Sequence, residues 1–165
     1  MTNTIEDIEK AEVLLVTGSN TTESHPVISY AVKRAVSFGG AKLIVVDPRR
    51  IPLVDYAHVW LRQDPGTDIA WINGMMQVIL QEGLQDEDFI SSRTQGPKEL
   101  KQVVSGYTPE YVQKLSGVDP EDLRAAARLY ARAGAASILY TMGITQHVRG
   151  TDNVKSLANL AMLCG

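Results

Sequence analysis

Residues 13–47 read VLLVTGSNTTESHPVISYAVKRAVSFGGAKLIVVD, and this stretch decides the fold. It begins and ends with short apolar runs, at residues 13–16 and 42–46, which are typical of parallel strands buried on both faces. Between these runs apolar residues recur at helical spacing after Pro26, a residue that suits the first turn of a helix. Two consecutive glycines then end the helix. The stretch therefore predicts a strand–helix–strand unit with parallel strands.

The same alternation continues toward the C-terminus. The pattern predicts a weaker strand at 58–61, a long helix at 69–81, shorter helices at 86–92, 97–104 and 109–115, a helix capped by Asp119, a strand at 136–140 and a closing helix from Thr151 or Asp152. We therefore expect one α/β domain over residues 1–165. Its core is a doubly wound, mainly parallel, Rossmann-like sheet, with a helical insertion over residues 84–134.

The composition of the chain argues against several classes of function. The formal net charge of −3 offers no basic surface for nucleic acid, and no apolar run approaches the length of a membrane span. The acidic start does not resemble a signal peptide, and the single cysteine, Cys164, excludes an intrachain disulfide. We expect no nucleic-acid partner, no membrane insertion and a cytoplasmic location. The apolar ending SLANLAMLCG predicts a fragment of a larger protein.

The loop after the first predicted strand, GSNTTESHP at 18–26, is the first candidate site. Gly18 allows close approach of the backbone to a phosphate, and the helix start that follows favours an anion. Ser19, Asn20 and Thr21 add neutral donors. The loop lacks both the G-x-G-x-x-G spacing and a Walker lysine. Taken alone, an ordinary strand-to-helix turn is the simpler interpretation.

Acidic residues follow in two further loops. Asp47 ends the second predicted strand, where a doubly wound fold binds ribose, and Arg49 suits a phosphate or a base; the simpler alternative is a turn with a surface salt bridge. In the loop QDPGTD, the carboxylate of Asp68 or Asp64 suits the paired N1–H and N2–H donors of guanine, which adenine lacks. The simpler alternative is that Thr67 or Asp68 caps the long helix.

The fourth candidate loop is MGITQ at 142–146, where Gly143 allows close approach and Gln146 offers a donor and an acceptor. The three histidines share no metal-ligand spacing, and the chain contains neither an HExxH nor a G-x-S-x-G motif. We therefore predict no catalytic residue and no metal ligand in this chain. The remaining conspicuous residues are interpreted as core: Cys164 as an inert thiol, the five methionines, Trp60 and Trp71.

Six segments taken in order carry a resemblance: VLLVTGSNTTESHPV, GAKLIVVDPRR, PGTDIAWINGM, YTPEYVQKLSGV, AARLYARA and YTMGITQHVRGTDNVKSLANLAML. Together they resemble the molybdopterin oxidoreductases, and most of all the large (alpha) subunit of formate dehydrogenases. The resemblance extends from about Ile5 to Gly165. Its specific parts are G-S-N-x-x-E-x-H-P and M-G-I-T-Q, whereas D-P-R occurs across the wider family.

The resemblance implies that this region is one of the α/β domains that hold a molybdopterin guanine dinucleotide. It implies these cofactor-binding positions: Gly18, Ser19, Asn20, Glu23 and Ser24 in the loop facing the phosphates and guanosine, Asp47 and Arg49 at the ribose and base, Gly66 and Asp68 at the guanine, and Met142, Gly143 and Gln146 near the pterin.

The same resemblance implies what lies outside the chain. The family binds molybdenum (or tungsten) through a cysteine or selenocysteine on a preceding segment, and its iron–sulfur cluster needs an N-terminal cysteine group. An arginine that assists formate chemistry lies on a following segment. The parent enzyme is thus expected to oxidise formate to carbon dioxide, or to run the reverse. It would do so with its remaining domains and electron-transfer subunits, while this chain binds the guanosine-diphosphate half of the cofactor.

Three alternatives remain open. The first is that the parent is a related molybdenum enzyme such as a nitrate reductase. The second is that the parent is a scaffold relative that has lost molybdenum, as in the iron–sulfur subunit of NADH dehydrogenases. The intact Gly18, Asn20, Asp47 and Asp68 argue against the scaffold. Without the resemblance, a generic mononucleotide-binding domain is the interpretation.

Overall fold

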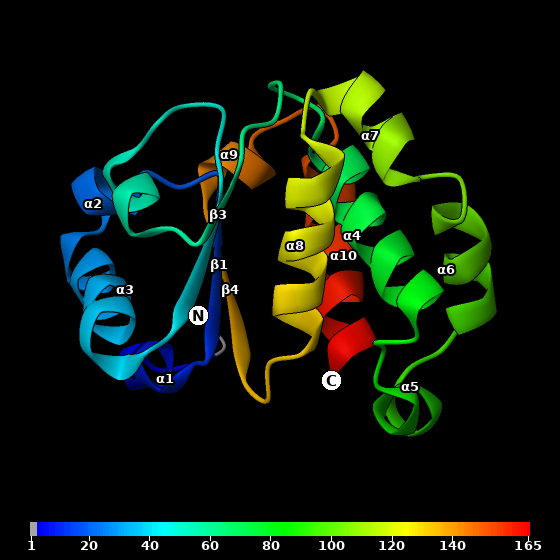
Figure 1. The fold of residues 1–165 in the computed structure, drawn as a ribbon, viewed down its shortest axis with the longest axis horizontal. Helices are drawn as coiled ribbons and strands as arrows, with labels where there is room; N and C mark the ends of the chain where they lie inside the picture. Colours follow the sequence, from blue (N-terminus) through cyan, green and yellow to red (C-terminus); the bar gives the residue numbers. More distant parts are fainter. Residues whose placement is uncertain (1–2) are drawn as a thin grey trace.

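Four parallel strands form the centre of the structure, a computed structural model that describes residues 3–165. Their order across the sheet is β3-β2-β1-β4, and helices cover both faces (Figure 1). The strands are β1 (Val13–Thr17), β2 (Lys42–Val46), β3 (Val59–Leu61) and β4 (Ala136–Tyr140). The expected doubly wound parallel sheet is confirmed, and each strand lies within one residue of its predicted bounds.

The register aligns the carboxyl ends of the strands. Val13 pairs with Lys42 on one side and Ala136 on the other, and Thr17 pairs with Val46 and Tyr140. β3 continues the sheet beyond β2, with Leu61 opposite Val46. Because all four strands run in the same direction, the loops that follow them emerge at one edge of the sheet.

One face of the sheet is covered by α1 (Ile5–Lys10) and α3 (Pro26–Gly39), with the short helix η1 (Pro52–Tyr56) beside them. α3 starts at a proline and ends at Gly40, whose φ of 77° lies in the left-handed region, as the sequence predicts. The apolar residues of this layer form a core with alternate side chains of β1 and β2: Leu14, Val16, Ala31, Val32, Ala35, Leu43 and Val45.

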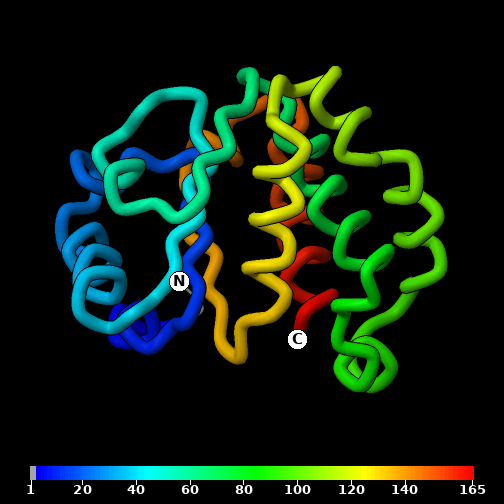
Figure 2. The backbone as a smooth tube through the Cα atoms, viewed as in Figure 1, coloured from blue at the N-terminus to red at the C-terminus, as the bar shows by residue number. Residues whose placement is uncertain are grey.

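The other face carries the larger core. α4 (Asp68–Glu82) is buried along most of its length, because α8 (Pro120–Ala131) and α10 (Gly150–Cys164) pack on it. Trp71, in the first turn of α4, is fully buried. Figure 2 shows the chain leaving β3 at one edge of the sheet, passing through the helices α4 to α8, and returning at β4 on the other edge, with α10 following β4.

The segment expected to be helical, residues 84–134, contains α5 (Glu87–Arg93), α6 (Pro97–Val104), α7 (Pro109–Ser116) and α8. Asp119 caps α8 as predicted, its carboxylate accepting from the Glu121 N–H at 2.8 Å. α8 contacts both β1 and β3, so the segment is joined to the sheet. The single-domain boundary itself stays a prediction.

Two kinds of detail differ from expectation. The short helices α1, α2 (Thr21–Ser24), η1 and α9 (Met142–Thr145) fall in stretches for which the sequence predicted no helix, because so few turns show no apolar periodicity. The interpretation of all methionines as core is wrong for Met142 and Met162, which are 61% and 40% exposed; Met1 lies outside the described residues. Met75 and Met76 are buried as expected, and Trp60 is half-buried.

None of the helices in residues 3–165 is long and apolar enough to cross a membrane.

Candidate functional site

The loops after the four strands enclose a trough of about 270 Å³ at the carboxyl edge of the sheet. Its lining comes from each of the four loops singled out in the sequence: Gly18, Asn20, Ser24, Asp47, Pro48, Arg49, Gln63, Pro65, Gly66, Asp68, Thr141, Met142, Gly143 and His147. The convergence follows from the parallel register, because every strand delivers its carboxyl end to the same edge.

Nine of the twelve predicted cofactor-binding residues line this trough, and three do not. Ser19 is buried with its hydroxyl 3.0 Å from that of Thr21, and it borders a different cavity. Glu23 is exposed on α2. Gln146 is exposed at the C-terminal cap of α9. Ser19 lies just before α2, Glu23 lies on it and Gln146 is the C-cap of α9, so short helices that the sequence pattern did not reveal shape the chain near all three positions.

Sequence reasoning missed several residues of the trough. Gln63 follows β3 by two positions, and Thr141 and His147 flank α9. Gln63 and Thr141 are polar residues near the ends of predicted strands, so the sequence could have identified both as candidates. His147 had no such signal, because only the turn of α9 brings it to the trough. Pro48 and Pro65 complete the lining.

The ends of β1 and β4 meet through two glycines. The Gly143 N–H donates to the Gly18 carbonyl at 3.0 Å, and the Thr141 hydroxyl donates to the same oxygen at 2.8 Å. A Cβ on Gly143 would lie 2.5 Å from that oxygen, and one on Gly18 would lie 2.7 Å from the Gly143 carbonyl carbon. Gly18 also has a φ of 56°. Glycine is therefore required at both positions, and the trough floor between them is bare backbone.

Asp47 is 3% exposed and held rigidly at the end of β2. Its Oδ1 accepts from the Arg49 N–H at 2.9 Å and lies 3.6 Å from the Arg49 Nε. Its backbone carbonyl accepts from the Trp60 indole N–H at 2.9 Å. The turn alternative is thus partly correct, because Asp47 does stabilise its own turn. Since Oδ1 makes these contacts, Oδ2 remains available to a ligand.

Asp68 is 4% exposed at the first position of α4. Its Oδ1 accepts a long hydrogen bond, 3.5 Å, from the Gln63 amide. It does not cap the helix, and the Thr67 hydroxyl donates to the Asp64 carbonyl at 2.6 Å instead. The sequence left Asp68 and Asp64 as equal candidates; only Asp68 lines the trough, and Asp64 is exposed.

Two buried acceptors near these carboxylates have no hydrogen-bond partner within the described residues: the Oδ1 of Asn20 and the Oε1 of Gln63. Leaving a buried polar atom unpaired costs about 1–3 kcal/mol. Such atoms call for an explanation, and a ligand that donates hydrogen bonds is one. The trough thus presents buried oxygen acceptors together with one guanidinium, Arg49, at its rim.

The titratable groups whose pKa values are shifted lie outside the trough. Burial raises the pKa of the Cys164 thiol to about 12, the near Asp86 carboxylate adding to the effect. Burial, helped by Lys42, lowers the pKa of His58, whose Nδ1 accepts from the Leu43 N–H at the far end of β2. Residues 3–165 contain no group of His, Cys, Asp or Glu side chains able to hold a metal ion.

The chain matches the family described as Molybdopterin oxidoreductase over residues 1–165. It is 52% identical to the F420-dependent formate dehydrogenase 1 subunit alpha of Methanococcus maripaludis and 42% identical to formate dehydrogenase H of Escherichia coli, over 165 residues in both cases. It is 40% identical to a nitrate reductase of Symbiobacterium thermophilum over 171 aligned positions.

Acetylene hydratase from Pelobacter acetylenicus has a similar structure, with a TM-score of 0.88, 28% identity and 98% of this chain covered. In each case the chain spans only about a quarter of the other protein: 24% of the Methanococcus protein, 23% of the Escherichia and Symbiobacterium proteins and 24% of the hydratase. The similarity therefore covers one region of much longer proteins.

Proposed function

Since the chain belongs to the molybdopterin oxidoreductase family, we propose that its trough binds the guanosine-diphosphate half of a molybdopterin guanine dinucleotide. The observation that carries this proposal is the pair of buried carboxylates, Asp47 and Asp68, beside the unpartnered oxygen of Asn20 in one trough. Buried carboxylates need donors, and a guanine and a ribose supply them side by side.

The hydrogen-bonding groups of the trough match those of guanosine diphosphate. The Watson–Crick edge of guanine presents N1–H and N2–H as adjacent donors, which suit Asp68 with Gln63 beside it. The ribose hydroxyls suit the remaining oxygen of Asp47. Arg49 at the rim suits a phosphate, and the bare backbone between Gly18 and Gly143 admits close approach of the cofactor. Met142, also lining the trough, lies on the side assigned to the pterin.

When bound, the cofactor would supply the redox chemistry through its molybdenum or tungsten. The residues of this chain bind and orient the nucleotide end and exclude water from it. We further propose that the parent is a formate dehydrogenase, whose metal ligand and iron–sulfur cluster lie in other domains and whose electrons pass to other subunits. The relatives that carry this name span residues far beyond these 165. The cytoplasmic location stays a prediction.

The fold of this domain does not determine which reaction the parent protein catalyses. A hydratase contains a region of the same structure, so a similar domain serves a protein of a different reaction class. The related nitrate reductase makes a nitrate-reducing parent the second candidate. Assays of the purified parent with formate and with nitrate would separate the two. Turnover of nitrate but not formate would remove the formate proposal and leave the cofactor proposal standing.

Titration of the 165-residue chain with GDP and with ADP, followed by NMR, tests the binding proposal. We expect GDP to shift the amide signals of Asp47, Gln63 and Asp68, and ADP to have a much weaker effect. Equal shifts with both nucleotides would contradict it. Acid release of nucleotides from the purified parent is an independent check, with GMP expected from the bound cofactor and no AMP.

A further inference from the structure

β4 has a paired edge and an open edge. It pairs with β1 along its whole length, but within residues 3–165 no strand lies against its other side. Its sequence, ASILY, is as apolar at its centre as that of β1, yet every residue of β1 is buried and none of β4 is. Strands of parallel sheets are normally covered on both sides, so β4 has the sequence of an interior strand in an edge position.

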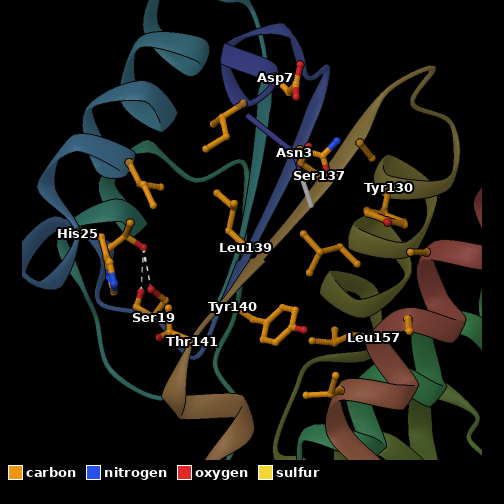
Figure 3. A pocket seen from close by; sticks show the side chains of 18 of the residues that line it. Asn3, Asp7, Ser19, His25, Tyr130, Ser137, Leu139, Tyr140, Thr141 and Leu157 are labelled. Atoms are coloured by element: carbon orange, nitrogen blue, oxygen red, sulfur yellow. Dashed lines mark hydrogen bonds between the residues drawn. The ribbon is translucent and has the colours of Figure 1, made fainter. Parts of the chain in front are cut away.

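A cavity of about 890 Å³ follows this open edge. It is lined by every residue from Ala136 to Thr141, with Leu157 and Met162 of α10 on one side and Ile8 and Ile28 on the other. Figure 3 shows Tyr140 extending toward α10, where Leu157 lies, and Ser19 and His25 on the opposite side of the strand. The cavity therefore surrounds the strand edge from both faces of the sheet.

The edge carries none of the features that protect natural edge strands. β4 contains no charged residue, no proline and no bulge in its register with β1. The opposite edge of the sheet differs, because β3 has only three residues and is followed by Arg62. Half of the backbone amide and carbonyl groups of β4 face the cavity, since alternate groups of a strand point to opposite neighbours.

The connections between strands indicate on which side the next strand belongs. The connection from β3 to β4 passes over the face covered by α4 and α8, and it moves toward the β4 edge. α10 packs on that same face, against α4. Connections of parallel strands share one hand, so a strand reached through α10 must move in the same direction, beyond β4. Ala136, Ala161 and Met162 line one cavity, so the end of α10 and the start of β4 face the same space.

We propose that an extended segment of the parent polypeptide, following α10, adds to the open edge of β4 as a fifth parallel strand. The relatives are about four times as long as the region they share with this chain, so most of such a polypeptide lies outside these residues. The backbone of the added strand would pair with the free groups of β4. Its side chains facing α10 would be apolar, because Leu157, Ala161 and Met162 form that wall, whereas the opposite wall mixes Ile8 and Ile28 with Thr4, Asp7 and His25.

Photo-crosslinking in the full-length parent tests this. Ser137, on β4 and in the cavity, is replaced by p-benzoylphenylalanine, and the irradiated protein is mapped by mass spectrometry. We expect a crosslink within the same polypeptide, to a segment after residue 165. The same amino acid at Phe38, which is 88% exposed on α3, should give no crosslink to that segment. Crosslinks to a second copy, to another subunit or to residues before Asn3 would overturn the proposal, as would none.

Hydrogen exchange gives a second test that needs no substitution. In the full-length parent, the amides of residues 136–141 should exchange as slowly as those of β1, because both edges of β4 are then paired. Deleting the crosslinked segment should accelerate exchange in β4 at least tenfold and leave β1 unchanged. Fast exchange of alternate β4 amides in the intact parent would contradict a fifth strand, whatever the outcome of the crosslinking.

Discussion

The backbones of Gly18 and Gly143 touch, and the Gly143 N–H donates to the Gly18 carbonyl at 3.0 Å. This contact joins the loop after the first strand to the loop after the last one, so the nucleotide side and the pterin side of the proposed site share a floor. A side chain at either position would separate the two loops.

Replacing Gly143 by alanine is therefore expected to lower both stability and binding. The new methyl group would lie 2.5 Å from the Gly18 oxygen, which is backbone and has little room to move. Overpacking of this kind costs about 1–3 kcal/mol in the free energy of unfolding. Urea denaturation measures it. Gly106→Ala is the matched control, because nothing lies within 4 Å of a Cβ there; equal losses in the two variants would contradict the contact argument.

Asp68→Asn should remove the preference for guanine. The substitution keeps the shape of the side chain but removes its charge, and a hydrogen bond to a charged group contributes about 1.5–3 kcal/mol. We expect the Kd for GDP to rise about 10- to 100-fold and that for ADP to stay unchanged, measured by NMR titration. Asp64→Asn, in the same loop but outside the trough, should bind GDP like the native chain. A loss in Asp64→Asn equal to that in Asp68→Asn would place the guanine elsewhere.

Gln63→Met should separate stability from binding. The residue is 4% exposed, and its Oε1 has no partner among residues 3–165, so a methionine of similar length removes an unpaired buried oxygen. We expect the free energy of unfolding of the nucleotide-free chain to change by no more than about 1 kcal/mol, because loss of the long hydrogen bond to Asp68 offsets the removal of the unpaired oxygen, and we expect GDP binding to weaken. Thermal denaturation with and without GDP measures both. Destabilisation without any change in the GDP-induced shift of Tm would assign Gln63 a structural role alone.

The sequence pattern predicted the sheet better than the site. β1, β2 and β4 were recognisable because strands in a parallel sheet are continuous apolar runs, and the candidate loops were recognisable because they follow those runs. The sequence could not show that the Ser19 hydroxyl pairs locally with that of Thr21 beside a different cavity. His147 was missed because a single turn of helix redirects the chain, and one turn leaves no periodic signal.

The ion pair between Arg128 and Glu82 predicts a small pH dependence. The Arg128 guanidinium donates to both Glu82 oxygens and thereby lowers the pKa of that carboxyl below its usual value. A lowered folded pKa adds stability above the unfolded pKa, and that stability is lost as the pH falls through the folded value. Both side chains are partly exposed, so Arg128→Met should lower the free energy of unfolding only slightly at pH 7.

Urea denaturation of Arg128→Met and the native chain at pH 7 and pH 3 measures this difference. It should shrink at the lower pH and in high salt, because protonation and screening each remove the attraction. Lys98→Met, an exposed cation on α6, serves as the control and should change little at either pH. A loss in Arg128→Met that is the same at both pH values would assign it to packing of the arginine stem rather than to the ion pair.

Cys164 should react slowly with thiol reagents while the chain is folded. Burial raises the pKa of its thiol to about 12, so at pH 8 the reactive thiolate is roughly 1,000-fold rarer than for a thiol at the ordinary value of 9.0. Maleimide labelling followed by mass spectrometry should therefore be slow in buffer and rapid in urea. The folded rate should rise with pH without levelling below pH 10. Rapid labelling in buffer would mean that the end of α10 opens readily, and with it the wall beside β4.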